Sequence, residues 1–454
     1  MKTLNTCKVG MALTAAAFLG LATSQPADAI TFSLTDLGTL GGNNSYANAI
    51  NDLGQVVGSS STADGQSRAF FWDNNSGMTN LGTLPTGNYG YCYYYYCSSS
   101  SSARAINDYG QAIGTSSTYY GGYYGGYEQN LFLWDKSSGM INLGIPGGYY
   151  SSSSATAINN LGQVIGNTYS HSGVYPFFWE KSSGIINLDT PRGYYSYSDD
   201  YSYATAINNL GQVVGTSSGY SGPYYRYQQN PFLWEKSSGM SNLGTLGGDY
   251  ASATAINDLG QVVGTSTTAD GQTRAFLWEK SSGMINLGTL GGNYSSATAI
   301  NDLGQAIGTS YTADGQNRPF FWDKSSGMIN LGSLGGYNSY ASAINNLGQV
   351  IGYSSTANGQ NRPFFWDKSS GMSDLNDLVL APDWILNSVV GINNAGQIVG
   401  NGLYNGQTRA FLLTPKSKSV PEPSSALAFL ALGAVGAGSW AKRKRQQQEA
   451  SSRN

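Results

Sequence analysis

A ten-residue motif recurs eight times along this chain of 454 residues and limits its possible folds more than any other feature. The commonest form is Ala-Ile-Asn-Asp-Leu-Gly-Gln-Val-Val-Gly, and successive copies lie 44 to 56 residues apart. A period of this size without a helical pattern is typical of small β-sheets repeated around an axis. The copies begin at Ala49, Ala105, Ala157, Ala206, Ala255, Ala299, Ala343 and, in a looser form, Gly391.

A single repeat, residues 252–289, predicts four short strands. We expect them at 252–256, 261–265, 274–279 and 284–288, because runs of β-branched and aromatic residues are separated there by Gly-containing turns. Four antiparallel strands per repeat make one blade of a β-propeller. Neighbouring blades must cover the faces of each sheet, so the repeats should form one domain.

The two ends of the repeat array complement each other. Residues 32–38 resemble a fourth strand with no blade before it, and residues 409–413 resemble a third strand with no fourth strand after it. We therefore expect the N-terminal strand to complete the last blade, which would remove exposed sheet edges. The predicted fold is an all-β propeller of eight four-stranded antiparallel blades over residues 30–415. Seven blades and an open solenoid are the alternatives.

Tryptophan ends the predicted third strand in seven of the eight copies, and Leu413 takes its place in the last. Regular placement beside Phe favours packing between blades over a row of sugar-binding platforms. The tryptophans are Trp72, Trp134, Trp179, Trp234, Trp278, Trp322 and Trp366.

The N-terminus has the features of a secretion signal. Lys2 and Lys8 provide positive charge, and an apolar run follows. Ala27-Asp28-Ala29 fits the small-residue cleavage rule, so we expect residues 1–29 to be a signal peptide cleaved after Ala29. A membrane anchor is the alternative, although the apolar run is short for a bilayer span.

The C-terminus carries a second sorting signal in three parts. They are a linker at 416–423 with the box Pro421, Glu422 and Pro423, an apolar transmembrane sorting helix at 424–441, and a basic cytoplasmic tail at 442–454 that includes Arg443 and Arg445. This order resembles the PEP-CTERM sorting signal of Gram-negative bacteria. The resemblance implies an exosortase-type processing enzyme, a precursor anchored in the inner membrane, and export to the cell surface or extracellular matrix. A plain tail anchor is the alternative.

The repeats themselves resemble the HAF family of extracellular repeats. The resemblance rests on the Arg-Ala-Phe-Leu-Trp segment and the Gly-Gln-Val-Val-Gly element before it, and it covers nearly all of residues 30–415. Copies two, three and four depart from it, because Asn130-Leu131, Tyr175-Pro176 and Asn230-Pro231 replace Arg-Ala. The family implies a secreted β-rich protein and no particular activity.

Insertions rich in Tyr, Gly and Ser interrupt several repeats. They fall between the second and third strands of a blade or between one blade and the next, so all of them should lie on one face of the propeller. A tyrosine ring stacks on a sugar ring and its hydroxyl donates a hydrogen bond, which predicts binding of exopolysaccharide or another envelope component. Flexible filler is the alternative. The candidate ligand-binding residues are Tyr119, Tyr120, Tyr123, Tyr124, Tyr194, Tyr195, Tyr201, Tyr224 and Tyr225.

The rest of the composition argues against catalysis. His171 is the only histidine and lies in a polar turn sequence, while the recurrent acids occupy turns or follow the tryptophan. Cys92 and Cys97 lie close together and are expected to form a disulfide in an oxidising compartment. We predict no catalytic residues, no cofactor and no metal site. A secreted polysaccharide lyase or hydrolase and a structural matrix spacer without ligand are the alternatives.

The charge of the exported part excludes one class of partner. The whole chain carries −3; the signal (Lys2, Lys8 and Asp28) accounts for +1 and the tail from Lys442 for +4, so the remaining body carries −3 − 1 − 4 = −8. Nucleic acids bind to positively charged surfaces, so we expect no nucleic-acid partner.

Overall fold

The computed structural model describes residues 30–85, 97–120, 126–144, 152–171, 173–188, 201–221 and 226–416. Over these ranges the chain is all-β and contains no helix. The predicted signal peptide, sorting helix and basic tail lie outside the described residues. No helix in the described part is both long and apolar enough to cross a membrane.

The described strands fall into eight groups of four, which we call units 1 to 8. Unit 1 comprises β2 (Gly41–Ile50), β3 (Val56–Thr62), β4 (Ser67–Asp73) and β5 (Gly77–Asn80), and unit 2 comprises β6 (Cys97–Ile106), β7 (Ala112–Tyr120), β8 (Gly126–Asp135) and β9 (Gly139–Gly144). Unit 3 comprises β10 (Ser152–Ile158), β11 (Val164–Ser170), β12 (Gly173–Glu180) and β13 (Gly184–Asn187), and unit 4 comprises β14 (Ser202–Ile207), β15 (Val213–Ser221), β16 (Arg226–Glu235) and β17 (Gly239–Asn242). Unit 5 comprises β18 (Gly247–Ile256), β19 (Val262–Thr268), β20 (Thr273–Glu279) and β21 (Gly283–Asn286), and unit 6 comprises β22 (Gly291–Ile300), β23 (Ala306–Thr312), β24 (Asn317–Asp323) and β25 (Gly327–Asn330). Unit 7 comprises β26 (Gly335–Ile344), β27 (Val350–Thr356), β28 (Asn361–Asp367) and β29 (Gly371–Asp374), and unit 8 comprises β30 (Trp384–Ile392), β31 (Ile398–Tyr404), β32 (Gln407–Pro415) and β1 (Phe32–Asp36).

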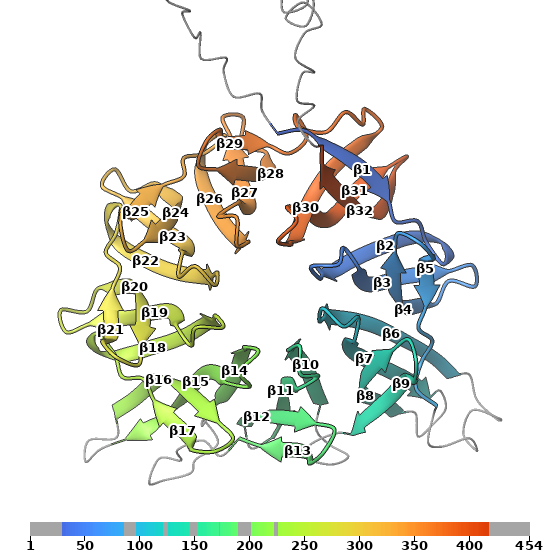
Figure 1. The fold of residues 1–454 in the computed structure, drawn as a ribbon, viewed down its shortest axis with the longest axis horizontal. Helices are drawn as coiled ribbons and strands as arrows, with labels where there is room; N and C mark the ends of the chain where they lie inside the picture. The colour runs from blue at the N-terminus through green and yellow to red at the C-terminus, as the bar shows by residue number, and fades with distance from the viewer. Residues whose placement is uncertain are drawn as a thin grey trace, which may run out of the picture.

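Figure 1 shows the units in chain order around a central opening. The first strand of each unit lies nearest the opening and the fourth lies at the periphery. Strands within a unit pair antiparallel, and units 4 to 7 are also joined by single parallel pairings such as Thr273 with Tyr294. Each first strand except that of the last unit ends on the motif's Ala-Ile, and its register shifts just before that pair, as between Ala253 and Ala255.

The N-terminal strand pairs with the C-terminal one, as the sequence predicted. β1 runs antiparallel to β32, with Leu34 opposite Leu413 and Asp36 opposite Phe411. Phe32 is almost fully buried and packs edge-on against Phe365 of unit 7, with ring centroids 5.4 Å apart. The two ends of the described chain are thereby held together in unit 8.

The apolar core lies between neighbouring units. Successive side chains of a strand point to opposite faces of the sheet, so Val262 packs in the cluster between units 4 and 5 while Val263 packs in the cluster between units 5 and 6. The recurrent tryptophans belong to these clusters: Trp234 is buried and Trp278 is half-buried. The predicted packing role of the tryptophans is therefore confirmed.

The glycine after the paired β-branched residues is explained by close packing. A Cβ on Gly264 would lie 1.9 Å from the carbonyl oxygen of Ser252 and 2.9 Å from the ring of Phe276. The glycine in the preceding turn has a different reason, because Gly260 adopts a φ of +73°, which favours glycine. Both glycines are therefore needed for the geometry of the sheet.

Candidate functional site

The asparagine of the repeated motif joins each unit to the next. In unit 1 the amide of Asn51 donates to Gln55 Oε1 (2.7 Å) and to the carbonyl oxygen of Asn107 in unit 2 (2.9 Å). Its oxygen accepts the backbone N–H groups of Leu53 and Gln55. The side chain is buried and every hydrogen-bonding position on its amide nitrogen is used.

The same inter-unit bond recurs in every unit and returns to its start. Asn393 of unit 8 donates to the carbonyl oxygen of Asn51 in unit 1 at 3.0 Å. The intervening donors bond at 2.9 or 3.0 Å and are Asn107, Asn159, Asn208, Asn257, Asn301 and Asn345. We call this closed series the asparagine ring.

The next residue of each motif forms a second closed series. Each backbone N–H donates to the side-chain oxygen of the equivalent residue in the following unit, at 2.8 to 3.1 Å. Two Asp residues alternate with two Asn residues around this series. Where an Asn and an Asp are neighbours, the Asn amide donates a hydrogen bond to the Asp carboxylate, as Asn394 does to Asp52 at 2.7 Å. In order they are Asp52, Asp108, Asn160, Asn209, Asp258, Asp302, Asn346 and Asn394, which we call the Asp/Asn ring.

The two rings line a cavity of about 350 Å³ at one end of the central opening. Three residues from each unit contribute to it, namely the isoleucine, the asparagine and the Asp or Asn of the motif. Since the buried amides are already bonded to neighbouring units, this arrangement serves to fasten the units together. Within the described residues, no group of three or more His, Cys, Asp or Glu side chains could hold a metal ion.

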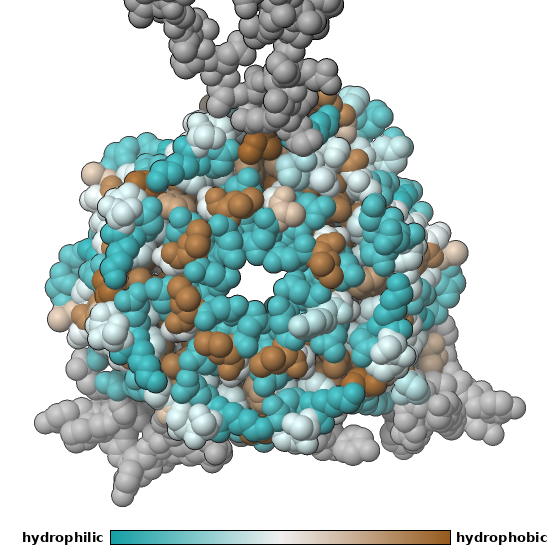
Figure 2. Space-filling view, in the orientation of Figure 1, coloured by the Kyte–Doolittle hydropathy of each residue, from teal (hydrophilic) through white to brown (hydrophobic). Residues whose placement is uncertain are grey.

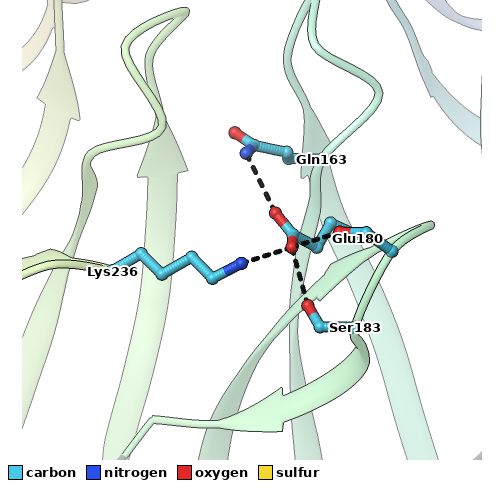
Figure 3. A network of polar contacts seen from close by, with 5 residues as sticks. Gln163, Glu180, Ser183 and Lys236 are labelled. Atoms are coloured by element: carbon cyan, nitrogen blue, oxygen red, sulfur yellow. Dashed lines mark hydrogen bonds and ion pairs between the residues drawn. The ribbon is translucent and has the colours of Figure 1, made fainter.

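Acids at the ends of the third strands make local hydrogen bonds and ion pairs. Glu180 accepts the hydroxyls of Ser182 and Ser183 at 2.6 and 2.7 Å and pairs with Lys236 of the next unit (Figure 3). The side-chain amide of Gln163 donates a hydrogen bond to the other carboxylate oxygen of Glu180. The Lys236 ammonium, followed by the serine hydroxyls, lowers the pKa of Glu180 from 4.5 to about 2.

Equivalent acids in other units have the same turn bonds. Asp323 accepts the hydroxyl and the N–H of Ser325 at 2.6 and 2.8 Å, and these bonds lower its pKa to about 2. These carboxylates therefore hold the turns at the ends of the third strands in place.

Two faces of the molecule differ in their exposed residues. The turn face carries the turns between first and second strands, at residues 51–55 and their equivalents. The loop face, at the other end of the units, carries the hairpins between second and third strands and the links between units. Exposed tyrosines near the loop face are Tyr119, Tyr127, Tyr169, Tyr201, Tyr250, Tyr311 and Tyr337.

The structure places three of the predicted ligand-binding tyrosines. Tyr119 and Tyr201 are 52% and 38% exposed, at the end of β7 and directly before β14. Tyr120 is less exposed and donates to Glu128 Oε2 at 2.6 Å. Burial and the adjacent Glu128 carboxylate raise the pKa of Tyr120 to about 12. The other candidates, Tyr123, Tyr124, Tyr194, Tyr195, Tyr224 and Tyr225, lie outside the described residues.

The remaining predicted sites are only partly placed. Cys97 is disulfide-bonded, while its predicted partner Cys92 lies outside the described residues. His171 is exposed in a turn, in agreement with the sequence. The sorting residues Pro421, Glu422, Pro423, Arg443 and Arg445, and the cleavage residue Ala29, also lie outside the described ranges.

The sequence interpretation missed the two hydrogen-bonded rings. It assigned the Asn-Asp pair of each motif to turn chemistry alone. The signal was the strict recurrence of Asn at the third motif position, where a turn would also accept Asp or Ser.

Comparisons with known families identify two segments. Residues 419–445 match the PEP-CTERM protein-sorting motif, which confirms that part of the sequence interpretation. This motif implies a surface-sorted protein processed by an exosortase, and it indicates export in Gram-negative bacteria. Residues 94–175 match a family described as a protein of unknown function, DUF3466. The resemblance to HAF repeats stays a prediction. No curated protein matches the chain.

Among solved structures, the chain is similar to dipeptidyl peptidase 4 of Porphyromonas gingivalis, with 9% identity and a TM-score of 0.51. That match covers 85% of this chain and 60% of the peptidase. A match to TolB of Acinetobacter baumannii has 12% identity and a TM-score of 0.32, and covers 64% of this chain and 77% of TolB. The chain spans about 58% of a puromycin hydrolase that it also matches. At these identities the similarity concerns the fold alone.

Proposed function

We propose that this protein is a noncatalytic, surface-sorted β-propeller that binds exopolysaccharide or another envelope component through the tyrosines of its loop face. The observation that carries the proposal is the segregation of exposed large apolar and aromatic side chains: tyrosines gather near the loop face, whereas those on the turn face are leucines and Tyr109. The rigid units provide a scaffold, and binding residues are commonly placed on loops of such scaffolds.

The proposed fold is an eight-bladed propeller in which units 1 to 8 are the blades. Eight groups of four strands, the β1–β32 pairing and the return of the asparagine ring from Asn393 to Asn51 support it. A seven-bladed arrangement would have to omit unit 8, which supplies the bonds at both of its junctions. Residues 30–415 would then form one domain.

The proposed route to the cell surface uses both ends of the chain. Residues 1–29 would be removed after Ala29, and residues 424–441 would hold the precursor in the inner membrane, with residues 442–454 on the cytoplasmic side. An exosortase would then act at the Pro-Glu-Pro box in residues 416–423. The match over residues 419–445 supports this order of events.

The loop-face tyrosines have the chemistry that sugars require. Tyr119 and Tyr201 expose enough ring area to stack on the apolar face of a pyranose, and their hydroxyls can donate to sugar oxygens. Tyr120 is held by Glu128, which in turn accepts the amide of Asn130 at 2.8 Å. This network orders the base of the β7–β8 hairpin beside the exposed Tyr119.

Binding of the native exopolysaccharide to matched variants tests the proposal. We expect Tyr119→Ala with Tyr201→Ala to weaken binding at least tenfold, because stacking and one hydrogen bond are lost at each position. Tyr340→Ala is the control: Tyr340 is 46% exposed but lies within β26, opposite Tyr353 and away from the loops. Equal affinity of all three proteins would contradict the proposal. Breakdown of the polysaccharide by the wild-type protein would favour the lyase or hydrolase alternative instead.

A further inference from the structure

The turn face exposes a ring of apolar side chains around a polar centre. The residue after each Asp/Asn-ring position is a leucine in six units, Tyr109 in unit 2 and Ala395 in unit 8. The leucines and Tyr109 are 63–76% exposed. Figure 2 shows apolar residues spaced around the central opening with hydrophilic residues inside them. We call these side chains the leucine ring: Leu53, Tyr109, Leu161, Leu210, Leu259, Leu303 and Leu347.

None of these side chains belongs to an apolar cluster of the described core. Each belongs to a turn whose geometry is set by the neighbouring asparagine and glycine, as Asn257 and Gly260 set it around Leu259. A polar residue would serve equally well at the exposed position, because the bond to Asn257 uses only the backbone N–H of Leu259. Repeated exposed leucines at one radius point instead to a contact outside the chain.

From this arrangement we infer that the turn face pairs with the turn face of a second copy of the chain, as a two-fold symmetric dimer. The inference is separate from sugar binding, which uses the opposite face. Identical faces meet in a two-fold dimer, so the same leucines occur on both sides.

The area of the leucine ring is sufficient for such a dimer. With about 100 Å² of apolar surface on each exposed side chain, the ring offers about 700 Å². A standard protein interface buries about 800 Å² on each partner. Polar groups of the Asp/Asn ring would supply the rest of the contact.

The charges of the Asp/Asn ring also fit a second copy. The order is two Asp, then two Asn, repeated once around the opening. A copy turned over about an axis in the plane of the ring presents the reverse order, and it can be rotated so that each Asp faces an Asn. Each carboxylate has spare acceptor positions, and Asn394, for example, uses only one of its two amide hydrogens on Asp52. Charge complementarity of this kind selects the register of an interface.

The rigidity of the turn face favours association further. Both closed rings of hydrogen bonds lie directly beneath the leucines and fix their turns relative to one another. Binding therefore orders few groups that were free before, which lowers its entropic cost.

The mass of the whole protein in solution, as the exporting cells produce it, tests the inference. We expect a particle of two chains in sedimentation equilibrium. Leu210→Asp with Leu303→Asp should raise the dissociation constant at least 100-fold, since each replacement costs tenfold or more. Ile385→Asp is the matched control: Ile385 is 52% exposed but lies near the start of β30, opposite Leu403 beside the hairpin of unit 8, on the loop face. It should leave the dimer unchanged.

Three results would overturn the inference. The first is a single-chain mass for the wild-type protein at its highest soluble concentration, a result that does not depend on any variant folding. The second is a dimer that survives the double replacement in a variant whose circular dichroism matches wild type. The third is a single-chain particle that binds vesicles of phosphatidylethanolamine and phosphatidylglycerol through the leucine ring, which would assign the face to a membrane. None of these bears on the tyrosine face, so the two proposals fail independently.

Discussion

At the residue scale, the motif asparagine does more than close a turn. Asn257 combines four hydrogen bonds, three within its own turn and one to the carbonyl oxygen of Asn301 in the next unit. It is 3% exposed, so truncation leaves several partners unsatisfied in a site that excludes water. The same residue type therefore shapes the turn and fastens one unit to the next.

Replacing this asparagine should destabilise the protein strongly. We expect Asn257→Ala to lower the free energy of unfolding by about 2–4 kcal/mol, because buried donors and acceptors lose their partners. Ser281→Ala in another turn of the same unit removes only an exposed side chain and should cost under about 0.5 kcal/mol. Urea denaturation followed by tryptophan fluorescence measures both. Similar midpoints for the two variants would show that the asparagine ring does not stabilise the fold.

Glu180 should make the stability of the folded protein depend on pH below about 4.5. Its pKa is lowered in the folded protein, so its contribution is complete above the ordinary value of 4.5 and is lost as the pH falls through about 2. Lys236→Gln removes the largest cause and raises the pKa of Glu180 in the folded protein, so the loss of stability should be smaller and should be complete at a higher pH. Thermal unfolding midpoints between pH 5 and pH 2 measure this, with exposed Lys181→Gln as control. The prediction fails if the two variants give the same pH profile.

At the element scale, the strands and the apolar packing between units were predictable, and the hydrogen bonds between units were not. The run from Val262 to Gly264 and the Phe-Leu-Trp run at 276–278 identify strands because side chains alternate between two buried faces. The first strand is longer than expected, beginning at Gly247 instead of residue 252, since its polar start pairs with Thr268 outside the hydrophobic pattern. Seven bonds of the asparagine ring join residues 44 to 56 apart and the closing bond joins residues 342 apart. Their acceptors are backbone carbonyls, which leave no trace in residue type.

The candidate site was predictable only as a location. Chain order predicts the Tyr-rich insertions on one face; most of their residues lie outside the described ranges, and Tyr119 and Tyr201 at their edges are exposed. Whether a given tyrosine hydroxyl bonds within the protein was not predictable. The hydrogen bond from Tyr120 to Glu128, for example, depends on the register of β7 and β8. The leucine ring was overlooked because a single exposed leucine in a turn carries no signal until its copies meet around an axis.

The strand β1 is the element most sensitive to a single replacement. Phe32 is 1% exposed against Phe365, Leu375 and the rest of the unit 7–8 cluster. We expect Phe32→Ala to cost about 3–5 kcal/mol, release β1 and expose the edge of β32. Light scattering during thermal unfolding should show earlier aggregation than in Ser33→Ala, which changes an exposed side chain of the same strand. Equal aggregation temperatures would contradict a latching role for β1.

At the scale of the whole molecule, the two ends of the domain and both rings depend on one another. Each unit leaves an apolar face that only its neighbours cover, and unit 8 is assembled from both termini. A closed array of this kind should unfold as one cooperative body, whereas an open array would fray from its ends. The turn face and the loop face are then opposite ends of one rigid scaffold, available for different partners.

Cross-linking of β1 to β32 tests closure most directly. Ser33 lies opposite Thr414 in the antiparallel pair, at a separation that suits a disulfide. We predict that Ser33→Cys with Thr414→Cys forms this disulfide nearly completely in the exported protein, as shown by mass spectrometry of linked peptides, and raises the unfolding temperature. Ser33→Cys with Thr168→Cys, a residue of β11 in unit 3, should form none. Absence of the Ser33–Thr414 cross-link in soluble, folded protein would contradict a ring closed by its two ends.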